Sequence, residues 1–80
     1  MEKSVNHAAY QALIAELVKA RKQQGLTALQ LGQSIGEDQS FVAKTETFVR
    51  KLSAIEMVQY AKALQLDPAE LVRVIEGKLK

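Results

Sequence analysis

The fold is decided by the segment Leu26-Thr27-Ala28-Leu29-Gln30-Leu31-Gly32-Gln33-Ser34-Ile35-Gly36, which continues as Glu37-Asp38-Gln39-Ser40-Phe41-Val42-Ala43-Lys44-Thr45-Glu46-Thr47. Thr27 and Gln30 stand at the spacing of a capping box, in which each side chain bonds to the backbone of the other residue. Leu31 and Ile35 lie one helical turn apart. Gly36 can end the helix, because glycine adopts a positive φ at low cost. The first half therefore predicts a short helix.

The second half predicts another short helix with a thin apolar stripe. Asp38 is a good N-cap, and only Val42 and Thr45 stand at inward spacing. Gly32 has the small size that a close crossing of two helices requires, and Gly36 suits the tight turn between them. The two helices predict a helix-turn-helix over about 27–47, with the second helix at about 39–47.

Three further helices are predicted around this motif. The first has Asn6 available as its N-cap and Gly25 as its end. Its apolar stripe consists of Tyr10, Leu13, Ile14, Leu17 and Val18. Ser53-Ala54-Ile55-Glu56 is a capping box for a fourth helix, and Asp67-Pro68 begins a fifth.

The predicted fold is therefore all-α, a compact five-helix bundle. We expect a single domain over residues 1–80, with its core from about 7 to 77. Tyr10 and Tyr60 are expected at the edge of this core, with their hydroxyl groups in water.

Composition narrows the classes of function. The 80 residues contain no cysteine, which excludes disulfides and thiolate metal sites, and one histidine, His7, which we expect to be solvated near a helix start. So short a chain has little interior for a catalytic pocket, so we expect no enzyme, metal or cofactor. Glu16 interrupts the first apolar stretch, so we expect no signal segment or membrane helix and place the protein in the cytoplasm. The net charge of +2 suggests a phosphate partner only weakly.

The chain resembles the phage-repressor (Cro/CI-like, XRE) helix-turn-helix family in three stretches at the correct separations. They are Arg21-Lys22-Gln23-Gln24-Gly25-Leu26-Thr27, Gln39-Ser40-Phe41-Val42-Ala43-Lys44-Thr45-Glu46 and Ala61-Lys62-Ala63-Leu64-Gln65-Leu66-Asp67-Pro68-Ala69-Glu70-Leu71. The resemblance extends from about Tyr10 to Leu71. It implies a domain that binds double-stranded DNA, usually as a two-fold dimer on a palindromic operator, and regulates transcription. We expect a repressor.

The resemblance also implies which side chains contact DNA. Three polar residues of the second helix of the motif match the base-facing positions: Gln39, Ser40 and Lys44. Glutamine can pair with adenine and lysine with guanine, in agreement with that role. Backbone contacts are expected from Thr27, Gln33, Phe41, Arg50 and Lys51. For Phe41, filling a gap against the preceding helix is an equal alternative.

Two structural expectations accompany these contacts. Arg21 and Glu46 match a salt bridge that ties the first helix of the family to the end of the third. The last helix carries apolar residues on more than one face, so we expect a homodimer through Val72, Ile75 and Leu79. One domain makes few contacts with DNA, which also favours a dimer.

Several departures from the family pattern favour an alternative, a protein-interaction or antitoxin-like module with weak or no DNA binding. Ala28 replaces a usual glutamine, and Glu37 and Asp38 would repel a phosphate. Phe48 and Val49 replace a glycine or small residue and a polar one, so the third helix is expected to run on for another turn.

Overall fold

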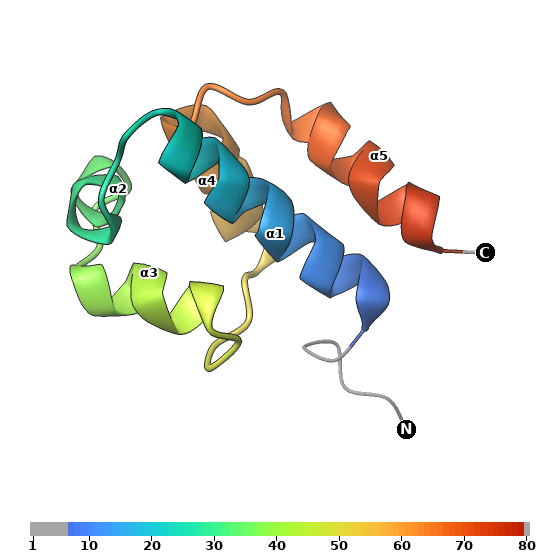
Figure 1. The fold of residues 1–80 in the computed structure, drawn as a ribbon, viewed down its shortest axis with the longest axis horizontal. Coiled ribbons are helices and arrows are strands. Elements are labelled where there is room, and N and C mark those ends of the chain that lie inside the picture. The colour runs from blue at the N-terminus through green and yellow to red at the C-terminus, as the bar shows by residue number, and fades with distance from the viewer. Residues whose placement is uncertain (1–6, 80) are drawn as a thin grey trace.

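The computed structural model describes residues 7–79, which form five helices and no strand (Figure 1). The helices are α1 (Ala8–Gln23), α2 (Ala28–Ser34), α3 (Gln39–Glu46), α4 (Ala54–Ala63) and α5 (Pro68–Lys78). Helix α5 packs along α1, and α2 packs against α3. The all-α prediction is confirmed. Within residues 7–79, no helix has the length and apolar character needed to cross a membrane.

The caps predicted for the last four helices are confirmed. Each cap side chain accepts a hydrogen bond from a backbone N–H of the first turn: Thr27, Asp38, Ser53 and Asp67. The threonine and the serine belong to complete capping boxes, with Gln30 and Glu56 as the reciprocal partners. The local sequence therefore determines where these helices begin.

Helix α1 begins at a different cap from the expected one. Asn6 lies outside the described residues, and the cap is His7, whose Nδ1 accepts a hydrogen bond from the Ala9 N–H at 3.0 Å. His7 is half-buried. Its ring therefore has a structural role at the start of α1.

Four helices end in the same backbone closure, in which the first three N–H groups beyond the helix bond back to carbonyls of its last turn. After α1 and α2, the left-handed residue is a glycine, Gly25 (φ 69°) and Gly36 (φ 75°), as predicted. After α3 and α4, it is Phe48 (φ 65°) and Gln65 (φ 58°). A left-handed conformation costs a residue with a Cβ roughly 1–2 kcal/mol.

The prediction that α3 runs on for another turn is wrong. The helix ends at Glu46, and the Val49 N–H turns back to the Lys44 carbonyl at 2.8 Å. The Phe48 ring lies edge-on to Tyr10 of α1, with ring centroids 6.2 Å apart. Such aromatic pairs contribute about 0.5–1.5 kcal/mol, which offsets much of the backbone cost at Phe48.

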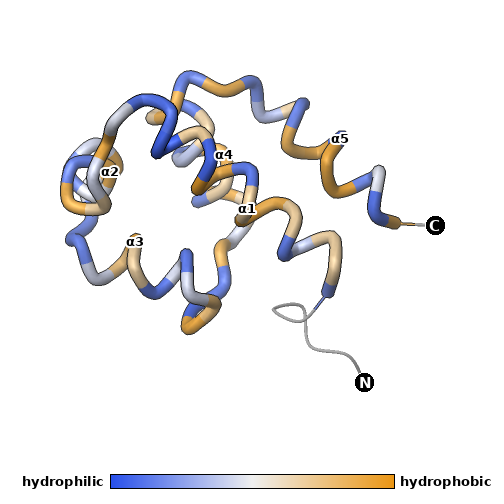
Figure 2. Tube along the Cα trace, in the orientation of Figure 1, coloured by the Kyte–Doolittle hydropathy of each residue, from blue (hydrophilic) through white to orange (hydrophobic). Residues whose placement is uncertain are grey.

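The core draws on all five helices, and Figure 2 shows hydrophobic positions along each of them. Its buried members are Leu13, Ile14, Leu17, Ala20, Leu31, Val42, Tyr60, Ala61, Leu64 and Leu71. Tyr10 packs at the edge of the core as predicted, but the prediction for its hydroxyl and the prediction for Tyr60 are wrong. The Tyr10 hydroxyl accepts a hydrogen bond from the Leu52 N–H at 3.0 Å. Tyr60 is 1% exposed, and burial raises the pKa of its hydroxyl.

The turn between α2 and α3 depends on the absence of a side chain at Gly32. A Cβ at this position would lie 2.7 Å from the Asp38 carbonyl oxygen and 3.0 Å from that of Glu37. Both atoms are backbone and cannot move without shifting the start of α3. The predicted close crossing at Gly32 is confirmed.

We expect Gly32→Ala to destabilise the protein by about 1–2 kcal/mol, because the clash outweighs the better helix propensity of alanine. Urea denaturation followed by circular dichroism measures the difference. Gly77→Ala is the matched control, since a Cβ there meets nothing within 4 Å. It should leave stability unchanged or raise it slightly. A Gly32→Ala protein as stable as the wild type would contradict the steric account.

Candidate nucleic-acid interface

Helix α3 buries one narrow face and exposes the rest. Val42 and Thr45 are 0% and 1% exposed, and they fix the inward direction. The remaining face consists of short or polar exposed side chains: Gln39, Ser40, Ala43 and Lys44. The three residues expected to contact bases therefore share one solvent-facing surface of a short helix that is fixed from behind.

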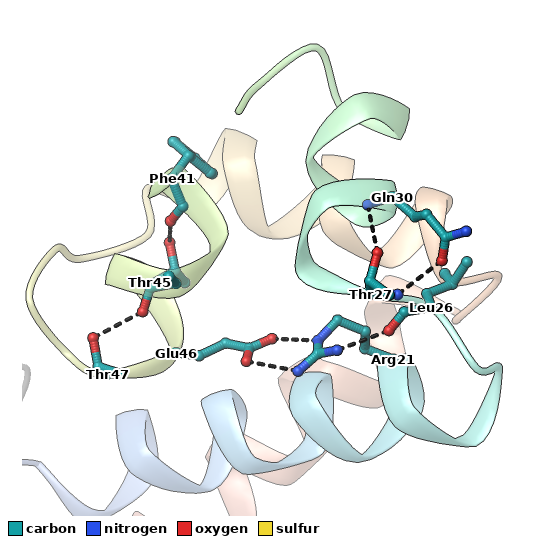
Figure 3. Close-up of polar contacts among 9 residues, drawn as sticks. Arg21, Leu26, Thr27, Gln30, Phe41, Thr45, Glu46 and Thr47 are labelled. Carbon is teal, nitrogen blue, oxygen red and sulfur yellow. Dashed lines mark hydrogen bonds and ion pairs between the residues drawn. The ribbon is translucent and has the colours of Figure 1, made fainter. Parts of the chain in front are cut away.

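The buried threonine satisfies its own polar group. Its Oγ1 donates a hydrogen bond to the Phe41 carbonyl at 2.8 Å, and Thr47 makes the same bond to the Ala43 carbonyl at 2.8 Å (Figure 3). The hydroxyl of Thr45 therefore does not need water. A threonine can therefore be buried at this position without an unpaired hydroxyl.

An ion pair between Arg21 and Glu46 joins the end of α3 to α1. The Arg21 Nε donates to Glu46 Oε2 at 2.6 Å, and the Nη2 donates to Oε1 at 2.9 Å (Figure 3). The Nη1 donates to the Leu26 carbonyl at 2.7 Å, so the guanidinium also holds the chain entering α2. The hydrogen bond to Glu46 raises the pKa of Arg21. The side chains are 13% and 17% exposed, which makes this pair structural.

Arg50 is held by contacts that were not predicted from the sequence. Its Nη1 and Nη2 donate to the two carboxylate oxygens of Glu56, each at 3.1 Å, and its guanidinium carbon lies 4.1 Å from the centroid of the Phe41 ring. The Glu56 carboxylate also accepts from the Ser53 N–H at 2.9 Å. The hydrogen bond from Ser53 is the main cause that lowers the pKa of Glu56, and the hydrogen bonds from Arg50 are the second.

These contacts set where the other expected DNA-backbone residues lie. Thr27, Gln33 and Lys51 are exposed around the motif. Phe41 is half-buried, tilted against Tyr60 at 6.4 Å between ring centroids, and packs on the core. Its ring thus fills space inside the domain and supports Arg50 as well.

The charge around α3 is reduced by internal pairing. Arg21 and Arg50 are engaged with Glu46 and Glu56, so two cations of the region are neutralised within the chain. Lys44 is exposed on α3, whereas Glu37 and Asp38 are exposed in the turn before it. The outward face of α3 is therefore mainly neutral and polar. Within residues 7–79, no group of three or more histidine or acidic side chains could hold a metal ion.

Comparisons with known proteins agree with this geometry. Residues 17–71 match the family model described as helix-turn-helix. A solved XRE-family like protein from Pseudomonas syringae pv. tomato str. DC3000 is 37% identical, with a TM-score of 0.83, and the match covers 91% of this chain and 89% of that one.

The chain belongs to the XRE family of helix-turn-helix proteins. This is a family of DNA-binding regulators, and the family prediction made from the sequence is confirmed. A search of the curated proteins gives no match. In this XRE-family chain, α2 and α3 are the two helices of the motif, and α3 is in the position of the recognition helix.

Glu46→Gln should destabilise this XRE-family protein by about 1.5–3 kcal/mol, because the Arg21 charge then lies partly buried without its counter-charge. Thermal or urea unfolding measures the loss. Glu70→Gln is the matched control, since Glu70 and Arg73 are 3.9 Å apart and more than 60% exposed. Its effect should stay within about 0.5 kcal/mol. Equal effects of the two variants would show that the buried pair contributes nothing beyond a surface pair.

Stability should depend on pH through Glu56. Its pKa is lowered in the folded protein, so its ionised form contributes stability above its ordinary pKa of 4.5, and this contribution disappears as the pH falls through the lower folded value. Glu56→Gln keeps a side chain that suits the capping box. The difference in urea midpoint between wild type and this variant should be constant above about pH 6 and shrink on acidification. A difference independent of pH would contradict the assignment.

Proposed function

We propose that this chain is a sequence-specific DNA-binding regulator of transcription, a repressor, that reads a palindromic operator with α3. The proposal is carried by one observation: Gln39, Ser40 and Lys44 are exposed on a helix whose opposite face is fully buried. Amide, hydroxyl and ammonium groups can read base edges in the major groove. As a DNA-binding protein, it would act in the cytoplasm.

Phosphate contacts would position α3 on the duplex. Thr27 and Gln33 are exposed on α2, and Lys51 is exposed beyond α3. The Arg50 side chain is 30% exposed and its guanidinium is already bound to Glu56, so we propose that it contributes to phosphate contact less than its charge suggests. Affinity would then come from few cations, and its dependence on salt would be modest.

Two copies would complete the reading of a palindrome, and we propose that they meet through α5. Val72 and Leu79 are 43% and 49% exposed, and Ile75 is half-buried beside them. Leu79 and Ile75 also line a groove of 230 Å³ against α1, together with His7, Ala9, Tyr10 and Leu13. A ridge beside a groove is the kind of self-complementary surface that a two-fold interface requires. Two recognition helices would then read half-sites about 34 Å apart.

Fluorescence anisotropy of a labelled duplex against salt concentration tests the DNA proposal. We expect the affinity to fall with salt and Lys51→Gln to reduce the slope of log affinity against log salt by about 1. Lys78→Gln on α5 is the matched control and should leave the slope unchanged if the α3 face binds. Selection from a random DNA pool should give a symmetric site, and Gln39→Ala should lose preference at one position of each half-site.

No binding at about 50 mM salt, with a slope near zero, would contradict DNA binding. That result would favour the alternative, an antitoxin-like or other protein-interaction module. The exposed carboxylates Glu37 and Asp38 and the neutralised Arg50 are the observations on that side. Binding without any sequence preference would contradict the reading role of α3 alone.

A further inference from the structure

The outward face of α4 carries apolar residues that no part of the described chain covers. Ile55 and Val58 are 71% and 36% exposed, and they share one helical face with the exposed Gln59 and Lys62. The opposite face of α4 supplies Tyr60 and the neighbouring alanine to the core. Branched side chains are poor choices for an exposed helix position, because they lose rotamer freedom without gaining burial.

This face leads into a groove between α2 and α4. The groove has a volume of 410 Å³ and is lined by Ser34, Ile35, Gln59, Lys62 and Ala63. Ile35 and the alanine give it an apolar base, and they pack partly on the core. Ser34 already donates its hydroxyl to the Gln30 carbonyl, so its oxygen remains as an acceptor at the rim. The apolar stripe and the groove together form one surface, which we call the α4 face.

The charge of the α4 face is positive. Lys62 is the one charged residue among those lining the groove, and its ammonium group makes no ion pair or hydrogen bond with the described residues. The acidic residue of the same helix, Glu56, bonds to Arg50 on another side. A lysine in the last turn of a helix is favoured by the helix dipole, which explains Lys62 by itself but not Ile55 and Val58.

We propose that the α4 face is a docking site for an acidic amphipathic helix of a partner protein. Its apolar residues would cover Ile55 and Val58 and enter the groove, and a carboxylate beside its apolar stripe would pair with Lys62. This is the helix-in-groove mode of recognition, in which residues spaced by three or four positions anchor one apolar face. The α4 face shares no residue with the base-reading set on α3, so the inference does not depend on the proposed function.

A displayed library of helix-forming peptides tests this proposal. The library carries fixed leucines at i, i+3 and i+7 and randomised flanking positions, and it is selected on the full 80-residue chain. We expect selected peptides to be enriched in Asp and Glu beside the leucines. A selected peptide, once synthesised, should bind the Ile55→Lys and Lys62→Glu variants about tenfold more weakly than it binds the wild-type chain. Lys78→Glu makes the same charge change on α5 and should leave the affinity unchanged.

The charge pairing has its own readout. Lys62→Glu should recover affinity for a version of the winning peptide in which the flanking acids are replaced by lysine. All three substituted sites are exposed, and circular dichroism melts of each variant verify that the fold is intact.

Several results would overturn the proposal. They are a selection with no enrichment over background, winners rich in Lys or Arg, and winners whose binding survives Ile55→Lys. Self-association of the free chain that Ile55→Lys abolishes would also overturn it, because a second copy would then occupy the α4 face.

Discussion

The Arg21 guanidinium makes three hydrogen bonds that join α1 to two other parts of the chain, the Glu46 carboxylate at the end of α3 and the Leu26 carbonyl before α2. A planar guanidinium fixes both the distance and the angle of a carboxylate that it binds through two atoms. The position of α3 relative to α1 is therefore determined at its C-terminal end. At its N-terminal end, the close approach at Gly32 places α3 against α2. The polar face of α3 depends on these two constraints for its direction.

Much of this fold follows from sequence patterns that involve residues only a few positions apart. Caps such as Thr27 and Ser53, and the glycines Gly25 and Gly36, act on the backbone within a few residues, so a sequence reveals them directly. The inward stripe of α3 followed from spacing alone. The ion pair of Arg21 with Glu46 came from the family resemblance, because its partners are distant along the chain.

The features that the sequence did not reveal depend on tertiary contacts. Phe48 adopts a glycine-like conformation because Tyr10 of α1 lies against its ring. Tyr60 lies inside the core. The helical spacing of the sequence indicates that its side chain points inward, but not how deeply its hydroxyl is buried. The pairing of Arg50 with Glu56 did leave a signal, since the capping box turns the glutamate back towards Ser53 and so towards the preceding loop. The contacts to DNA and to a second copy remain predictions.

The two left-handed residues with side chains have a consequence for how the molecule opens. Backbone strain at Phe48 is released whenever the loop between α3 and α4 leaves its closed form, whereas the glycine turn after α1 releases none. Opening this loop also separates the Phe48 ring from Tyr10, so the aromatic contact opposes the release of strain. The loop after α3 is therefore held closed by a contact with a distant helix, whereas the turn at Gly25 has no strain for such a contact to offset.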